Sequence, residues 1–439
     1  MSETKKLPVT SYRGTRDFYP EDMHMRNYIF GTMRRVAESF GYQEYDGPML
    51  ESFELYAAKS GDELVNEQLY HFIDRGNRHV AIRPEMTPTV ARMVAARLSD
   101  LQRPIRWFSF PNLWRYEKPQ RGRLREHWQF NVDILGSDAI DADREIIEIA
   151  CRVMFSLGAD KNDFSIHISN RKILTYFLET VLKLPESLWP HIHRAIDKRS
   201  KISTEAFDEM LSEMKLSSDQ IGEIHAYLNL TDREIDRHPV SQSPAFADIQ
   251  HLLEGLSILG LDDVCRLDFS IVRGLEYYTG TVFEMYDMAP ENRRALFGGG
   301  RYDNLVGLFS KERVSGVGFG MGDVTIGDFL QTHNLLPVPE PPAHVHVALF
   351  DENTRNSASS LADLLRSEGL KTTCQLEPSK LGKQFKWADI QKIPIVVLQG
   401  PEELSRNHVQ VKHLATHNQI TVPLPDLVQT IKKLLDIDV

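Results

Sequence analysis

The sequence has little cysteine, no long apolar run and no excess of positive charge. Only three cysteines occur in 439 residues, and they are widely spaced, with no Cys-x-x-Cys pair. A disulfide framework and a zinc ribbon are therefore not expected, and a reducing compartment is. The N-terminus lacks an apolar core of signal-peptide length, and no later run approaches the roughly 18 apolar residues of a membrane span. These absences predict a soluble, cytoplasmic protein without a membrane partner.

The charge balance is acidic. A formal net charge of −11 gives no global electrostatic footprint of a nucleic-acid binder, so any such partner must meet a local basic patch. The chain length of 439 residues predicts two or three domains, because single hydrophobic cores rarely grow past roughly 250 to 300 residues.

Periodicity divides the chain into regions. From Glu21 to Phe40 apolar residues recur at helical spacing, and Gly41 predicts the end of that helix. Strand-like alternation follows, interrupted by a hairpin-like turn at residues 74–77. Residues 171–259 show helix-period clusters and almost no strand alternation, which predicts an inserted helical subdomain.

A proline-rich stretch marks a boundary near the C-terminal end. The segment NLLPVPEPPAHVH, residues 334–346, holds four prolines and favours an extended linker. Beyond it, strand and helix patterns alternate at short spacing, which predicts a small α/β domain with a mainly parallel sheet.

Two strand-like stretches, residues 105–115 and 125–135, flank a turn-like KPQRG sequence. In the second stretch Gln129, Asn131 and Asp133 share one face, because side chains alternate with period two. Alternation of this kind is by itself typical of a solvated outer face.

The loop between these strands favours a ligand instead. Seven Lys or Arg residues stand against one acid, Glu117, between Arg103 and Arg125. A charge run is usually a solvated surface, but Arg115 would end one strand while Arg123 and Arg125 begin the next, so three guanidinium groups can converge. Guanidinium groups match phosphate oxygens bidentately, which predicts a polyphosphate ligand without a Walker A or kinase glycine loop.

Two further segments complement this hairpin. RPEMTPT, residues 83–89, places Glu85 and Thr87 on a short extended stretch fixed by prolines, and a carboxylate beside a hydroxyl suits a ligand ammonium. GVGFGMGD, residues 316–323, precedes an expected helix, so a planar or phosphorylated group could lie close to its backbone. Glycine-rich strands also occur where backbones simply pack closely.

The segment VRGLEYYTGTVFE, residues 272–284, crowds polar side chains around two glycines in a strand-like context. The paired tyrosines Tyr277 and Tyr278 taken alone favour ordinary sheet packing.

Together these segments resemble the histidyl-tRNA synthetase family of class II aminoacyl-tRNA synthetases, over nearly the whole chain. RGTRDFYP (13–20) resembles the N-terminal signature, FGYQEYDGPMLE (40–51) resembles motif 1 with its proline at Pro48, and residues 110–136 resemble motif 2. RPEMTPT and VRGLEYYTGTVFE resemble the histidine-specific segments, and the second is the most specific match. Residues 344–439 are similar to the anticodon-binding domain of the class IIa enzymes.

The resemblance implies an α+β catalytic domain with an antiparallel sheet, a helical insertion, and a C-terminal α/β anticodon-binding domain. The expected boundaries are 1–170 for the first part of the catalytic domain, 171–259 for the insertion, 260–331 for the second part of the catalytic domain, 332–343 for the linker, and 344–439 for the anticodon-binding domain.

The activity implied is ATP-dependent ligation of L-histidine to tRNA(His) through a histidyl-adenylate, releasing AMP and pyrophosphate. ATP and Mg²⁺ are implied as substrate and ion, and a homodimer built on motif 1 as the assembly. No editing domain is expected, because a pocket that hydrogen-bonds both imidazole nitrogens rejects wrong amino acids by roughly 10⁴ or more.

Residue roles also follow from the resemblance. Arg115 and Arg273 are the implied catalytic residues at the α-phosphate; Glu85, Thr87 and Gln129 would receive the α-amino group. The implied histidine-binding set is Glu85, Met86, Thr87, Arg115, Gln129, Asp133, Arg273, Tyr277 and Tyr278, in which Asp133 and Tyr278 bracket the imidazole. The implied ATP-binding set is Arg115, Glu117, Arg123, Arg125 and Gly320. No protein side chain is assigned to a metal.

One position departs from the family pattern. Motif 3 usually ends in a Gly-x-Glu-Arg sequence whose arginine binds the γ-phosphate, but this chain has Thr325 there. Either another cation takes that role, or ATP is held less tightly at its far end. Two alternatives stay open: the synthetase-like regulatory subunit of ATP phosphoribosyltransferase, which generally lacks the anticodon-binding domain, and a histidine- or tRNA-sensing module without adenylation activity.

Overall fold

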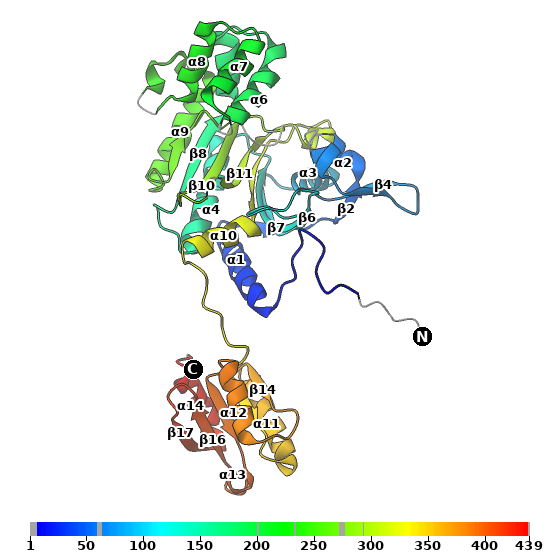
Figure 1. The fold of residues 1–439 in the computed structure, drawn as a ribbon, viewed down its shortest axis with the longest axis vertical. Coiled ribbons are helices and arrows are strands. Elements are labelled where there is room, and N and C mark those ends of the chain that lie inside the picture. Colours follow the sequence, from blue (N-terminus) through cyan, green and yellow to red (C-terminus); the bar gives the residue numbers. More distant parts are fainter. Residues whose placement is uncertain are drawn as a thin grey trace. The chain divides into compact units, whose positions relative to one another are not determined.

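The computed structural model describes residues 7–58, 64–199, 202–231, 234–271, 277–292 and 294–437. The chain forms two compact units, Met1–Pro337 and Val338–Val439 (Figure 1). This division falls inside the proline-rich segment. None of the helices in the described part of the chain combines the length and the apolar character needed to cross a membrane.

A nine-stranded sheet forms the centre of the first unit. Its order is β1 (Gln43–Glu44), β5 (Ile105–Ser109), β7 (Glu126–Leu135), β12 (Gly316–Gly322), β11 (Ala295–Tyr302), β10 (Thr281–Asp287), β8 (Phe164–Asn170) and β9 (Cys265–Leu267), with β6 (Asn112–Trp114) paired to β7. Among the described strands of this sheet, only the edge pairs β1–β5 and β8–β9 are parallel. The expected antiparallel catalytic sheet is therefore confirmed, with one parallel strand added at each edge.

Three helices cover one face of this sheet: α1 (Pro20–Ser39), α4 (Ile140–Ser156) and α10 (Asp323–Thr332) (Figure 1). Phe130, Val132 and Ile134 of β7 belong to the core cluster that these helices share. The helix predicted for residues 21–40 is confirmed, and Gly41 follows it with a φ of +79°, a conformation that glycine adopts without strain. The opposite face of β7 carries Gln129, Asn131 and Asp133.

A small sheet of β2 (Leu50–Ser52), β4 (His79–Ile82) and β3 (His71–Ile73) accompanies α2 (Phe53–Ala57), η1 (Leu64–Gln68) and α3 (Thr87–Ala96). The hairpin turn predicted at residues 74–77 joins β3 to β4, with Asn77 at a φ of +59°. Asp74 Oδ1 accepts hydrogen bonds from the backbone of Gly76 and Arg78, which explains why this sequence turns.

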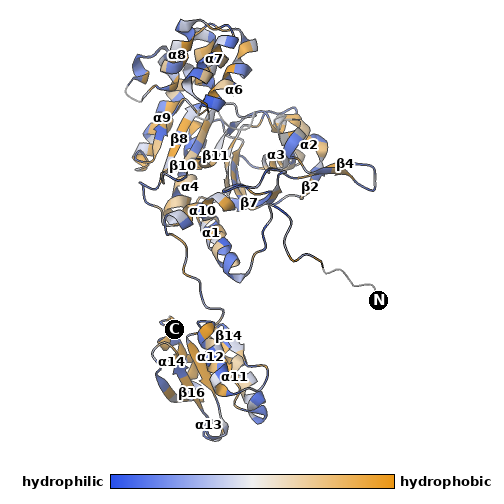
Figure 2. Ribbon diagram, viewed as in Figure 1, coloured by the Kyte–Doolittle hydropathy of each residue, from blue (hydrophilic) through white to orange (hydrophobic). Residues whose placement is uncertain are grey.

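The described residues between 171 and 258 are helical wherever they form regular structure. The elements are α5 (Arg171–Tyr176), η2 (Phe177–Val181), η3 (Glu186–Leu188), α6 (Trp189–Arg199), α7 (Thr204–Glu213), α8 (Ser218–Leu228), η4 (Ile235–Arg237), η5 (Pro239–Gln242) and α9 (Pro244–Ile258). Ser203 and Ser217 cap α7 and α8 through their side chains. Phe207 and Tyr227 belong to the same core cluster as Ile146 and Phe283, so the helical region and the sheet share one core. The ribbon coloured by hydropathy has orange, hydrophobic stretches both in these helices and in the strands (Figure 2).

The second unit has its own core and its own sheet. The strand order is β14 (Thr372–Cys374), β13 (Val345–Ala348), β15 (Ile395–Leu398), β16 (His408–His413) and β17 (Gln419–Pro423). The remaining elements are η7 (Glu352–Thr354), α11 (Arg355–Ser367), α12 (Leu381–Ile390), α13 (Pro401–Ser405), η8 (Leu424–Asp426) and α14 (Leu427–Leu434). The expected α/β fold is confirmed, but the sheet is mixed rather than mainly parallel: β14–β13 and β13–β15 are parallel, β15–β16 and β16–β17 antiparallel. The last two strands form a hairpin, which needs no helical crossover.

Candidate active site

A pocket opens on the polar face of β7, between that strand, the glycine-rich strands and the start of α3. Its lining includes eight residues expected from the sequence, Glu85, Thr87, Arg115, Gln129, Asp133, Tyr277, Tyr278 and Gly320. The lining also contains five residues that were not expected, Asn131, Gly298, Tyr302, Gly318 and Phe319. Residues from distant parts of the sequence therefore meet in one polar cavity.

The polar face of β7 is buried at Asn131 and Asp133, whereas Gln129 is partly exposed. Asn131 is 5% exposed and Asp133 is 4% exposed, so the interpretation of this face as solvated is wrong. The reason is tertiary, because β12, β11 and the segment around Tyr277 enclose it. Asn131 could have been found from the sequence, since it alternates with Gln129 and Asp133.

Alternate glycines of β12 make room for the pocket's side chains. A Cβ at Gly316 would lie 2.4 Å from the Tyr302 ring, one at Gly318 would lie 2.3 Å from Asp133 Oδ1, and one at Gly320 would lie 2.0 Å from Gln129 Nε2. The glycine-rich sequence is compatible with a planar or phosphorylated group close to this backbone, or with close packing of the backbone. In the structure the chain's own side chains occupy the space at all three glycines.

Asp133 and Tyr302 form a hydrogen-bonded pair on the pocket wall. The Tyr302 hydroxyl donates to Asp133 Oδ1 at 2.5 Å. Burial raises the pKa of Asp133 to about 7, and the hydrogen bond from Tyr302 opposes that rise. Tyr302 carries no local sequence signal for this role, because its partner lies 169 positions away.

Glu85 provides a second buried carboxylate, 3% exposed, at the other side of the pocket. It accepts a hydrogen bond of 3.0 Å from the Tyr277 hydroxyl. Burial, and then the charge of Glu85, raise the pKa of Tyr277, so this phenol stays a donor at neutral pH. Thr87 is the first residue of α3 rather than part of an extended stretch, because Pro88 lies in the first helical turn, where no backbone N–H is needed.

Arg115 is fixed at the pocket by the backbone. Its Nε donates to the carbonyl oxygen of Pro84 at 2.9 Å, and the residue lines the cavity. Arg83 braces the same region, since it donates to the carbonyl oxygens of Asn112 and Gly47 and to Asp46 Oδ1. Arg115 is therefore pre-oriented beside Glu85.

The other expected ATP-site residues of the motif 2 loop lie outside the pocket lining. Arg123 is half-exposed, with its Nη1 3.6 Å from Glu117 Oε2. Arg125 lies over the Tyr116 ring, with 4.1 Å from Cζ to the ring centroid, and donates to Tyr12 Oη and to the Glu117 carbonyl oxygen. These contacts hold Arg125 on the N-terminal segment.

Met86 is buried beside Arg83, with 3.8 Å between Sδ and Nη1, and does not line the pocket. Arg273 lies outside the described residues, as do its neighbours from 272 to 276.

His127 lies on the same face of β7 as Gln129 and Asp133 but does not line the pocket. Burial, together with the nearby guanidinium groups of Arg115 and Arg16, lowers the pKa of His127 to about 3. The imidazole is therefore neutral at any working pH. The same alternation that selects Gln129 and Asp133 includes it.

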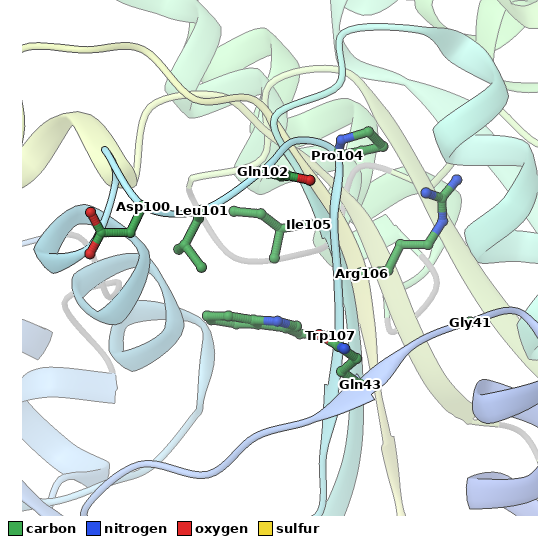
Figure 3. A pocket seen from close by; sticks show the side chains of 9 residues that line it. All are labelled: Gly41, Gln43, Asp100, Leu101, Gln102, Pro104, Ile105, Arg106 and Trp107. Atoms are coloured by element: carbon green, nitrogen blue, oxygen red, sulfur yellow. The ribbon is translucent and has the colours of Figure 1, made fainter.

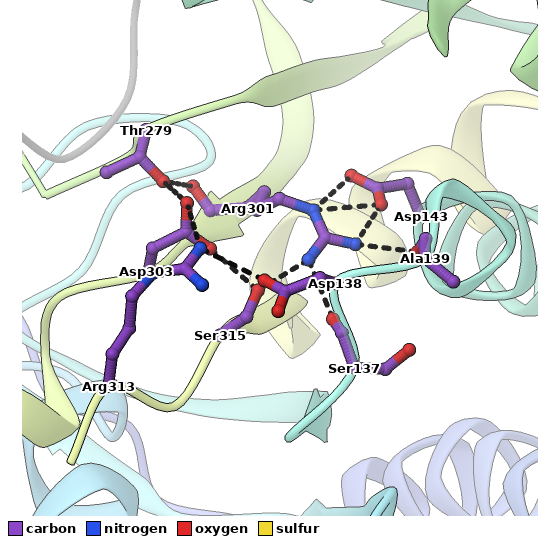
Figure 4. Close-up of polar contacts among 9 residues, drawn as sticks. All are labelled: Ser137, Asp138, Ala139, Asp143, Thr279, Arg301, Asp303, Arg313 and Ser315. Carbon is purple, nitrogen blue, oxygen red and sulfur yellow. Dashed lines mark hydrogen bonds and ion pairs between the residues drawn. The ribbon is translucent and has the colours of Figure 1, made fainter.

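A buried polar network supports both tyrosine segments of the pocket (Figure 4). Arg301 pairs with Asp143 and donates to the carbonyl oxygens of Ser137 and Ala139 and to Ser315 Oγ. The backbone N–H of Thr279 donates to the Arg301 carbonyl oxygen at 2.7 Å, and Thr279 Oγ1 donates to Asp303 at 2.9 Å. Tyr278 and Tyr302 each neighbour a residue of this network, which fixes their backbone.

Thr325, which stands where motif 3 usually has an arginine, makes a local hydrogen bond. Its hydroxyl donates to the Gly322 carbonyl oxygen at 3.1 Å, at the start of α10. Two cations reach α10 from other segments: Arg16 pairs with Asp323 at 2.7 Å, and Arg121 with Asp328 at 2.9 Å.

A second hollow, with a volume of about 280 Å³, lies at the edge formed by β1 and β5 (Figure 3). Ile105 and Trp107 lie on one side of β5, while Arg106 extends from the other side and binds Glu145 at 2.7 Å. Its larger size does not make it the site, because no set of buried polar groups converges there. Among the described residues, no group of three or more His, Cys, Asp or Glu could hold a metal ion.

Comparison with known proteins identifies the family. The family model for histidyl-tRNA synthetase matches residues 14–323, and the model for an anticodon binding domain matches residues 343–434. A histidine–tRNA ligase of Leptospira biflexa is 45% identical over 430 residues, covering 98% of both chains. One of Opitutus terrae is 38% identical over 420 residues, covering 94% of this chain and 95% of the relative.

Solved structures agree on the fold. The histidyl-tRNA synthetase of a Nostoc species superposes with a TM-score of 0.83 at 25% identity, covering 98% of this chain and 100% of the other. A Bacillus halodurans structure, described as an ATP phosphoribosyltransferase regulatory subunit/histidyl-tRNA synthetase, has a TM-score of 0.74 at 24% identity, covers 87% of this chain and 97% of the other, and supports the fold alone. With both family models matched and relatives similar over nearly the full length, this chain belongs to the histidyl-tRNA synthetase family.

Proposed function

We propose that this protein attaches L-histidine to tRNA(His), using ATP and passing through a histidyl-adenylate. The observation that carries the proposal is the pocket itself. It combines two buried carboxylates, Glu85 and Asp133, with the guanidinium of Arg115. A zwitterionic amino acid with a polar ring needs this set of partners.

Histidine recognition uses the two ends of the pocket. Glu85, Thr87 and Gln129 receive the α-amino group, because an ionised carboxylate with neutral acceptors suits an ammonium. Asp133 and Tyr278 bracket the two imidazole nitrogens, and Tyr277 holds Glu85 in place through its hydroxyl. A wrong amino acid would leave these buried groups unpaired, which disfavours it strongly.

Activation is an in-line displacement at phosphorus. A histidine carboxylate oxygen forms a bond to the α-phosphorus of ATP, the bond from that phosphorus to the bridging oxygen breaks, and pyrophosphate leaves with the electron pair. Arg115 positions the carboxylate and α-phosphate and stabilises the charge that develops. We assign the same role to Arg273, the outer phosphates to Arg123, and the remaining ATP contacts to Glu117, Arg125 and Gly320.

Mg²⁺ fits this site as a partner of the nucleotide. In phosphate-transfer sites it is held largely by substrate phosphates and water, with at most one or two carboxylates, so no three-ligand protein cluster is required. When bound, it neutralises charge on the phosphate oxygens.

Transfer follows on the same face. A hydroxyl of the terminal tRNA ribose attacks the carbonyl carbon of the adenylate, and AMP leaves. The anticodon-binding unit, which matches its family model over residues 343–434, supplies a second contact for the tRNA.

We also propose a homodimer in the cytoplasm. Support comes from one face of the small sheet, where Leu50 of β2 and Phe72 of β3 lie opposite Ile82 and Val80 of β4 and are 47% and 46% exposed. Large apolar side chains gathered on a surface mark interaction sites. Light scattering should give twice the mass of one chain, and cell fractionation should place the protein with cytosolic markers; a monomeric mass or a membrane fraction would contradict these two proposals.

The function is tested by ATP–pyrophosphate exchange with each of the twenty amino acids. We expect exchange with histidine alone, followed by charging of tRNA(His). Exchange would also show that Thr325 does not abolish ATP chemistry. Histidine binding without exchange would instead indicate a regulatory or sensing protein. Arg273→Ala is expected to reduce histidine-dependent exchange strongly, and near-normal exchange would remove the proposed role of Arg273.

A further inference from the structure

Tyr302 is a buried phenol in the pocket to which the family resemblance assigned no role. It comes from β11, lies over Gly316 of β12, and donates to Asp133 Oδ1 across the sheet at 2.5 Å. Asp133 in turn lies over Gly318. Each of these glycines leaves the space of a missing Cβ, so the pair fits into a recess that the backbone provides.

Among the residues that the structure describes, no cation compensates the charge of Asp133. The titratable groups that face it in the described part of the chain are four phenols: Tyr42 after α1, Tyr45 after β1, Tyr278 before β10, and Tyr302 on β11. The residues opposite it in the neighbouring strands, Trp107 of β5 and Gly318 of β12, do not titrate. Among these groups, Tyr302 is the one that stabilises the ionised carboxylate through a hydrogen bond.

We propose that Tyr302 is a positioning residue for histidine recognition, which keeps Asp133 an ionised acceptor and leaves its Oδ2 to accept the ring N–H of the substrate. The inference rests on the proposed function, in which Asp133 binds the imidazole. An ionised carboxylate has no proton to donate. Asp133 therefore acts as an acceptor towards the substrate as well as towards Tyr302. A protonated Asp133 would instead present a donor, and one tautomer of the ring would lose its partner.

The direction of the pH effect follows from the donor. Tyr302 stabilises the charged form of Asp133 and so lowers its pKa from the value that burial alone would give. Removing the hydroxyl raises that pKa, and Asp133 is then protonated over a range of pH in which the wild type is ionised. Without the hydroxyl, kcat/KM for histidine should therefore fall at the lower pH, where Asp133 is protonated, and be kept at alkaline pH, where it is ionised.

The test is the ratio of kcat/KM for histidine in Tyr302→Phe to that of the wild type, measured by pyrophosphate exchange between pH 6 and 9.5. The titration of free histidine cancels in this ratio. We expect the ratio to fall by about 10- to 100-fold from alkaline to neutral pH, because a hydrogen bond to a charged group changes an equilibrium by roughly that factor. A purely structural loss would lower the ratio equally at every pH and would overturn the proposal.

Tyr286→Phe is the matched control, because its hydroxyl donates to the carboxylate of Glu284 outside the pocket. The ratio of its kcat/KM for histidine to that of the wild type should not change with pH. Incorporation of 3-fluorotyrosine at position 302 covers the case in which Tyr302→Phe fails to fold. The more acidic phenol is a stronger donor and should lower the pKa of Asp133. The fall in kcat/KM for histidine at acid pH should therefore occur at a lower pH than in the wild type, and an unchanged pH profile would overturn the proposal. Histidine-specific exchange by the wild type with flat ratios in both variants would reject this inference and leave the function standing, whereas absence of histidine exchange in the wild type would reject both.

Discussion

At the scale of single residues, the pocket places carboxylates where little water reaches them. Glu85 is 3% exposed and is proposed to bind the substrate ammonium. Glu85→Gln should raise KM for histidine by about 10- to 150-fold, since a hydrogen bond to a charged group contributes roughly 1.5 to 3 kcal/mol. KM for ATP should change little. Pyrophosphate exchange at varied histidine and varied ATP measures both.

The control for this prediction is Glu145→Gln. Glu145 binds Arg106 and Tyr42 and does not line the pocket. Its KM for histidine should match that of the wild type. An unchanged KM in Glu85→Gln would show that the ammonium is bound elsewhere.

Another residue-scale prediction concerns stability. Arg301 and Asp143 are both buried, and Arg301→Met would leave the Asp143 carboxylate without its partner. Such a loss costs about 3 to 5 kcal/mol in the free energy of unfolding. Denaturant unfolding should reveal it. Arg121→Met removes an exposed pair with Asp328 and should cost at most about 1 kcal/mol. Equal losses in the free energy of unfolding of the two variants would mean that burial does not determine how much these ion pairs contribute to stability.

At the scale of elements, β12 is the strand against which the pocket residues Tyr302, Asp133 and Gln129 pack. Gly318→Ala would place a Cβ 2.3 Å from Asp133 Oδ1 and 2.5 Å from the Val132 carbonyl oxygen. Backbone cannot move aside cheaply, so we expect a loss of about 1 to 3 kcal/mol in stability and a lower kcat/KM for histidine. Thermal unfolding and exchange assays measure the two effects.

Gly307→Ala is the control for the β12 prediction, because no atom lies within 4 Å of the Cβ it would add. Its stability and its exchange activity should stay near those of the wild type. If Gly318→Ala behaved in the same way, the glycines of β12 would not be needed for packing around Asp133.

At the scale of the whole molecule, two units with separate cores suggest separable tasks. A chain ending at Pro337 should keep histidine-dependent pyrophosphate exchange, since every described pocket residue lies in the first unit. Charging of tRNA should weaken by about 10²-fold or more in kcat/KM for tRNA, because a linked second contact raises avidity by roughly that factor. Full loss of exchange in a folded fragment would contradict this division.

Much of the fold was predictable because its signals are local. The helix before Gly41 and the β3–β4 turn follow from periodicity and turn residues within a few positions. The mixed sheet of the second unit was not predictable in this way, since strand direction depends on how β15, β16 and β17 connect in space. The burial of Asn131 and Asp133 was not predictable from alternation either, because alternation shows that a face is polar without showing what covers it.

The sequence by itself determined the helices and most strands, the family resemblance, and the residue types of the candidate site, since these depend on short-range spacing and recognisable motifs. Only the tertiary structure decided that Tyr302 reaches Asp133, that Arg125 rests on Tyr116, and that alternate glycines of β12 receive pocket side chains. A hydrogen bond or ring contact requires two groups within a few ångströms of each other. When the two residues are 169 positions apart, as Tyr302 and Asp133 are, that proximity comes from strand order and register, which no local pattern specifies.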